Sequence, residues 1–152
     1  MAAYTPPMRF SETAVVAASV EESFDYVTDQ AKLPEWNEHV EDAEVLGGGP
    51  VGVGSLLRQH RRRGNKEFAL TFEVVEHDRP HRHSVKGTVF GVDTLMTFEF
   101  APHDGGTLVT QTADVTGKGV RSLLARVVVK EMHKSVLAGL DQLRSRLGIR
   151  PS

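Results

Sequence analysis

Apolar and polar residues alternate along several short segments of the chain, a pattern typical of strands with one buried face. In residues 67–77, for example, Phe68, Leu70, Phe72 and Val74 fall on one face. Turn residues rich in Gly, Pro, Asp and Asn separate these segments, which favours an antiparallel meander. We predict strands over residues 9–18, 40–49, 54–62, 67–77, 82–89, 93–100 and 107–116.

Two short helices are expected between the first two strands. Ser19 is followed three residues later by Glu22, the spacing of a capping box, so a helix is predicted over 19–29. Pro34 interrupts the segment 31–39, so only a further helical turn is expected there.

The apolar period changes near the C-terminus. Apolar residues from Val120 to Leu147 recur mostly every four positions, which predicts one amphipathic helix over 120–147, about 40 Å long. Gly148 and Pro151 would end it. A sheet with one apolar face must be covered, and only this helix is long enough to cover it. We therefore predict an α+β fold in which a curved antiparallel sheet of about seven strands wraps around the C-terminal helix.

Length, charge and composition narrow the expected domain organisation, partners and location of the protein. The chain has 152 residues, a usual size for one domain, so a single domain over 9–148 is expected, with flexible termini at 1–8 and 149–152. The net charge of −2 gives no reason to expect a nucleic-acid partner. Cysteine is absent, and neither a signal peptide nor a membrane span is recognisable, so a cytoplasmic protein is expected. The sequence leaves a monomer and a homodimer both open.

Three histidines lie within seven residues, at His77, His81 and His83. A zinc site needs three or four convergent ligands, whereas the turn at 78–80 separates these side chains and places His77 and His81 near solvent. We therefore expect no metal and no cofactor. His83 shares its strand face with Val85, so its side chain is expected to point inward.

The basic segment 58–66 reads as the solvated tip of a hairpin, because aromatic residues do not interrupt it and the acidic stretch 35–44 offsets its charge. Leu56 and Leu57 are both apolar, so either Arg58 or Gln59 can point inward; the alternation does not decide which.

Five segments together resemble one superfamily: 16–46, which contains the sequence LPEW, then 52–58, 72–82, 98–115 and the helix end at 139–148. In this order they are similar to the helix-grip superfamily, which includes START lipid-transfer domains, the birch-pollen allergen, coenzyme Q-binding proteins and bacterial polyketide cyclase/dehydrase-like proteins. The resemblance implies a bacterial protein with a cavity between sheet and helix. It implies no single activity, since one fold carries enzymes and binders alike.

From the resemblance and the inward strand faces we expect the cavity to bind a small hydrophobic molecule such as a lipid, quinone, isoprenoid or polyketide. Gln111 would orient it by a hydrogen bond. Two alternatives stay open: an enzyme of the polyketide cyclase, aromatase or dehydratase kind, with catalytic residues unassigned, and a protein-interaction module. Trp36 either only fills space among the two short helices or contacts the ligand. The expected lining consists of Trp36, Phe72, His83, Phe90, Met96, Phe98, Gln111, Met132 and Val136.

Overall fold

The structure is a computed structural model that describes residues 8–116 and 121–148, with side chains of the last helix described from residue 123. Its elements in chain order are β1 (Met8–Val16), α1 (Val20–Thr28), the 3-10 turn η1 (Gln30–Lys32), α2 (Leu33–Trp36), β2 (Val40–Val45), β3 (Leu56–Arg63), β4 (Lys66–Asp78), β5 (Arg82–Val89), β6 (Val92–His103), β7 (Gly106–Thr116) and α3 (Arg121–Leu147).

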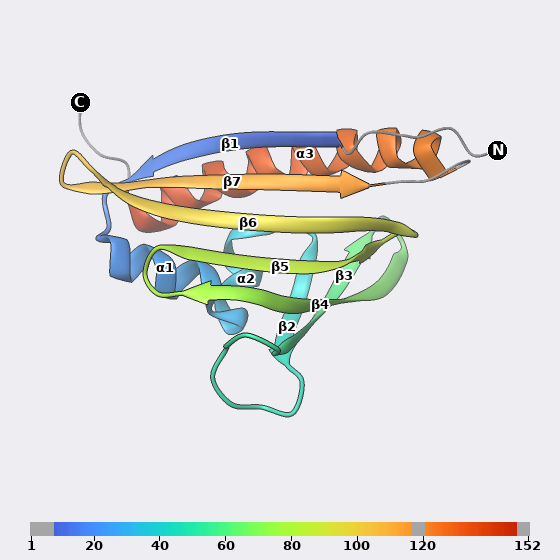
Figure 1. The fold of residues 1–152 in the computed structure, drawn as a ribbon, viewed down its shortest axis with the longest axis horizontal. Coiled ribbons are helices and arrows are strands. Elements are labelled where there is room, and N and C mark those ends of the chain that lie inside the picture. The colour runs from blue at the N-terminus through green and yellow to red at the C-terminus, as the bar shows by residue number, and fades with distance from the viewer. Residues whose placement is uncertain (1–7, 117–120, 149–152) are drawn as a thin grey trace.

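All strands pair antiparallel in one seven-stranded sheet of order β1-β7-β6-β5-β4-β3-β2, as far as the described residues go. Figure 1 shows α3 running along β1 and β7, while α1 and α2 lie toward one end of the sheet. The predicted helix-grip architecture is confirmed: a curved antiparallel sheet, a long C-terminal helix, and short helices after the first strand.

The two short helices form where their capping residues predict. The Ser19 hydroxyl accepts a hydrogen bond from the Glu22 backbone N–H at 3.1 Å, which satisfies a donor that the first helical turn leaves free. Pro34 lies in the first turn of α2, where a missing N–H costs nothing. Trp36 is the last residue of α2, so this turn fixes where its side chain enters the core.

Several boundaries differ from those expected. β2 ends at Val45 rather than 49, because Gly47, Gly48 and Gly49 all take positive φ and lead the chain into a loop. At the other end of the sheet, Met8 already pairs with Val115, so β1 begins inside the segment expected to be flexible. The rest of the predicted flexible termini, and residue 120 of the predicted helix, lie outside the described residues.

The core consists of two apolar clusters. One joins α1, α2 and the second half of α3 to β1, β6 and β7, with Phe24 and Leu140 almost fully buried. The other joins the first half of α3 to β4–β7 around Val92 and Val115. Met132 packs against both clusters. The sheet and α3 therefore pack against each other in two clusters, one at each half of the helix. The space that remains lies between the sheet and α3.

Candidate functional site

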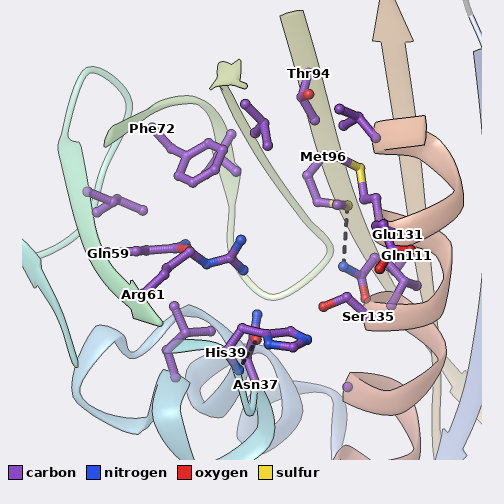
Figure 2. Close-up of a pocket in the computed structure, with 18 of the residues that line it drawn as sticks. Asn37, His39, Gln59, Arg61, Phe72, Thr94, Met96, Gln111, Glu131 and Ser135 are labelled. Carbon is purple, nitrogen blue, oxygen red and sulfur yellow. Dashed lines mark hydrogen bonds between the residues drawn. The ribbon is translucent and has the colours of Figure 1, made fainter. Parts of the chain in front are cut away.

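A cavity of about 390 Å³ lies between the inner face of the sheet and α3. Side chains from α1, α2, α3 and strands β3–β7 line it, and most of them are apolar. That volume falls within the range of ligand pockets that hold drug-sized molecules. Figure 2 shows polar side chains entering it from different sides: Gln59 and Arg61 from β3, Gln111 from the sheet, and Ser135 from α3.

The structure brings together every residue that the sequence predicted for the lining. Their contact with a ligand stays a prediction. Their position in the wall of one cavity is what the structure gives. Eight have buried or partly buried side chains, and Phe90 is the exception. The nine predicted residues found in the lining are Trp36, Phe72, His83, Phe90, Met96, Phe98, Gln111, Met132 and Val136.

Trp36 closes one part of the cavity wall. Its side chain is 4% exposed and meets Phe98 edge-on, with ring centroids 6.0 Å apart. A Cβ on Gly139 would stand 3.4 Å from the indole ring, so the absence of a side chain there gives the ring its place. Glu35 and Glu38, on either side of Trp36 in sequence, are exposed. The indole N–H has no acceptor among the described residues, so the ring offers a hydrogen-bond donor in addition to its packing.

Phe90 lies at the rim of the cavity rather than in its interior. It is 49% exposed and has a φ of 50° in the turn between β5 and β6. Its ring packs on Phe68 at 5.4 Å. Two exposed residues of α3, Leu124 and Val127, also line the cavity, so these side chains mark its mouth.

The structure decides which face of β3 points inward. Leu57, Gln59 and Arg61 line the cavity, whereas Arg58 is exposed. The reading of the whole basic segment as a solvated hairpin tip is therefore wrong for Arg61. It holds better for its neighbour Arg62, which pairs with acidic side chains at the surface.

Arg61 is a largely enclosed cation that has no counter-ion among the described residues. It makes no side-chain hydrogen bond or ion pair with the described residues, and its Nε is buried without an acceptor. Burial lowers the pKa of Arg61 to about 10, so the guanidinium is still charged at neutral pH. The Oε1 atom of the nearby Gln59 is also buried and has no donor in the described part of the chain. These two side chains give one wall of the cavity unsatisfied polar groups.

Gln111 faces the cavity from β7. Its Nε2 donates a weak hydrogen bond to the Met96 sulfur at 3.3 Å, drawn as the dashed line in Figure 2. Its Oε1 is buried and has no donor among the described residues. Gln111 therefore keeps an acceptor for another molecule, which fits the orienting role expected for it.

His83 is 3% exposed and packs against a second histidine. Its Nδ1 lies 3.0 Å from Nδ1 of His77, and the Phe24 ring stands near both imidazoles, at 6.3 Å and 5.1 Å between centroids. Burial, and less strongly the proximity of His77, lowers the pKa of His83 to about 4, so the ring is neutral at pH 7. His77 is partly buried, because α1 covers it, whereas the prediction placed it near solvent.

Two other histidines lie outside the lining. His81 is exposed, and the His133 imidazole lies 3.1 Å from the Glu12 carboxylate. Across residues 8–116 and 121–148, no group of three or more His, Cys, Asp or Glu side chains is arranged to hold a metal ion.

Sequence reasoning missed several polar lining residues besides Arg61. Thr94 alone carried a usable signal, because it shares a strand face with Met96 and Phe98. The others come from a helix or from loop segments, where alternation gives no guide. They are Gln30, Asn37, His39, Glu131 and Ser135.

No helix of the described chain combines the length and the apolar character that crossing a membrane requires.

Fold and cavity together define a helix-grip protein with an internal apolar site. The chain belongs to the family described as polyketide cyclase / dehydrase and lipid transport, which matches residues 7–148. No curated protein matches the sequence.

Solved structures share the fold at low sequence identity. The di-domain aromatase/cyclase StfQ from the steffimycin biosynthetic pathway has a TM-score of 0.76 at 13% identity, with 93% of this chain covered. This chain spans only 50% of StfQ. Ara h 8.0201 has a TM-score of 0.69 at 14% identity, covering 92% of this chain and 99% of the other. A Rhodobacter sphaeroides protein has a TM-score of 0.72 at 21% identity, covering 91% and 90%. Identities this low establish the fold alone.

Proposed function

We propose that the protein binds, and carries, a small hydrophobic molecule in the cavity between the sheet and α3. The observation that carries this proposal is the cavity itself, about 390 Å³ of space with a mostly apolar wall in the middle of the domain. Protein interiors are normally packed to crystal density, so a space of this size is not a packing defect. Burial of apolar ligand surface would drive binding at roughly 25 cal/mol per Å², before ordering costs.

The polar atoms of the wall support the same proposal. The indole N–H of Trp36 and the Oε1 atoms of Gln59 and Gln111 are buried and unpaired within the described chain. Buried polar groups in folded proteins are almost always hydrogen-bonded, and an unmet one costs about 1–3 kcal/mol. A ligand with a few polar atoms would satisfy them and acquire a fixed orientation.

The binding proposal is tested by filling the cavity. Met132 faces it from α3, so Met132→Trp places a larger ring inside. We expect this variant to lose affinity for the neutral fluorescent probe N-phenyl-1-naphthylamine at least about tenfold, because the space is lost. We also expect native mass spectrometry of the wild-type protein, purified from its own host, to show a co-purified compound that the variant lacks.

Leu137→Trp is the matched control, since Leu137 is 47% exposed on α3 and does not line the cavity. It should bind the probe like wild type. Thermal unfolding of both variants shows whether they fold. If folded wild-type protein binds neither the probe nor any co-purified compound, the binding proposal is wrong.

The second candidate is a cyclase or dehydratase, which the family description and the histidine in the wall favour. Such an enzyme needs a group that exchanges a proton near neutral pH. Burial makes the His83 imidazole a weak base, with its pKa lowered to about 4, so binding without chemistry is the better supported function. A rate with a bell-shaped pH profile that disappears in His83→Ala would favour the enzyme instead.

The mouth of the cavity carries an ion pair that should slow exchange slightly. Arg63 at the end of β3 contacts Glu131 of α3 at 3.3 Å, and both residues line the cavity. Exposed ion pairs contribute about 0.2–1 kcal/mol, so Glu131→Gln should speed dissociation of N-phenyl-1-naphthylamine by at most about fivefold. Stopped-flow dilution measures this rate. Asp141→Asn is the control, because Asp141 pairs with Arg144 on the same helix away from the lining, and an equal effect there would contradict the interpretation.

A further inference from the structure

The arginines on the two faces of β3 have different surroundings. On the outer face Arg62 stands opposite Glu67 of β4 and pairs with it. On the inner face Arg61 stands between Val40 of β2 and Phe68 of β4. The strand register therefore gives the outward cation an acidic cross-strand partner and gives the inward cation only apolar cross-strand partners.

No acidic side chain of the described lining is free to balance Arg61. Glu131 is the one acidic residue there, and it contacts Arg63 at 3.3 Å and Lys134 at 3.7 Å. Figure 2 shows the Arg61 guanidinium extending from β3 into the open space, away from the strand. Buried charges in proteins are normally paired, because an unpaired one loses its hydration without compensation.

We propose that the cavity selects ligands with one negative charge, whose carboxylate pairs with Arg61 while the apolar part lies against side chains such as Phe72 and Phe98. This inference rests on the proposed function and names the chemical class of its ligand.

The geometry favours a carboxylate over a phosphate. A guanidinium presents a planar pair of N–H donors that match the two oxygens of a carboxylate. Arg62 and Arg63 are already paired with acidic side chains, so Arg61 is the one unpaired arginine of the described lining. The second charge of a phosphate would have no cation of its own. The ligand class is thus an apolar carboxylic acid.

Two competitors that differ only in charge test this inference. Decanoate and decan-1-ol have the same chain length, and each is titrated at pH 7.5 against protein loaded with N-phenyl-1-naphthylamine. We expect decanoate to bind wild type at least about tenfold more tightly than decan-1-ol, because charged hydrogen bonds are the strong ones. In Arg61→Met the affinity for decanoate should fall at least about tenfold, while that for decan-1-ol changes little. Arg61→Lys should keep part of the preference.

Arg58→Met is the matched control, since Arg58 lies on the same strand with its side chain outside. It should keep the wild-type preference. Equal binding of acid and alcohol by wild type, or an equal loss of both in folded Arg61→Met, would overturn the inference. Failure of wild type to bind either the neutral probe or any co-purified compound would instead overturn the proposed function, so the two failures are distinguishable. Retained binding of the probe shows that Arg61→Met is folded; if it is not, Arg61→Gln takes its place.

Discussion

Arg61→Met is expected to stabilise the ligand-free protein by about 2–3 kcal/mol, because it removes an unpaired buried charge and keeps a side chain of similar length. The size follows from burial, which lowers the pKa of Arg61 to about 10 and so opposes the charged form by about 3 kcal/mol. At pH 7 the side chain is charged in both the folded and the unfolded state, so the full penalty applies. It would be relieved only above about pH 10.

Urea unfolding at pH 7.5 measures the effect, with co-purified compounds removed beforehand because a bound ligand would stabilise wild type. Arg58→Met should change the free energy of unfolding by no more than about 0.5 kcal/mol, since that side chain is exposed. A destabilised Arg61→Met variant would mean that the guanidinium has a structural role, and would contradict the interpretation.

A group that costs stability and makes no contact to offset it is typical of a functional site. The same substitution is expected to raise stability and to lower affinity for decanoate. If the arginine were purely structural, its replacement would lower the stability of the protein. If it lay on the surface, its replacement would change neither the stability nor the affinity for decanoate. The two measurements on one variant thus separate the three roles.

The fold could be predicted from the sequence because its local signals agree. Strict alternation in 67–77 and a four-residue apolar period in the last helix leave few other arrangements, and the Ser19 cap marks where α1 begins. Inward faces of strands then placed Phe72, Met96 and Gln111 in the cavity wall before any contact was known.

Arg61 was missed because alternation fails on its strand. Leu56 and Leu57 are adjacent apolar residues, and a shift of one residue exchanges the two faces of a strand. In the structure Leu57 is 3% exposed and Leu56 is 43% exposed, so the inner face continues through Gln59 to Arg61. A hydrophobic pattern cannot identify an inward arginine, because it treats every cation as a solvent-facing residue.

The surroundings of His77 and Phe90 depend on tertiary packing that the sequence pattern does not show. The pattern places His77 at a strand end, but α1 packs against that end and the Phe24 ring covers the imidazole. Phe90 is apolar, yet it belongs to the turn between two strands, which holds it at the cavity rim. Neither effect is visible in the residues next to them in sequence.

The stability of the protein is expected to fall by about 2 kcal/mol between pH 7.5 and pH 5.0, because His83 is buried in its neutral form. Burial lowers its folded-state pKa to about 4, whereas the unfolded chain takes up a proton near pH 6.5. The stabilising contribution is therefore complete above about pH 6.5 and is lost as the pH falls toward 4.

The other groups that bear on His83 act in the same direction or at lower pH. His77 faces it at 3.0 Å, and burial lowers the pKa of His77 as well, although Asp25 opposes this change. The pKa of Asp25 is itself held down by Arg79, so that carboxylate loses its contribution only in more acidic solution. Of these neighbouring groups, the two imidazoles are the ones that act between pH 7.5 and 5.0. Urea unfolding of His83→Gln should show a clearly flatter pH dependence there, while His103→Gln, on the exposed β6–β7 hairpin, should keep the wild-type slope. An unchanged slope in His83→Gln would mean that His83 takes up its proton alike in the folded and the unfolded chain, and would contradict the prediction.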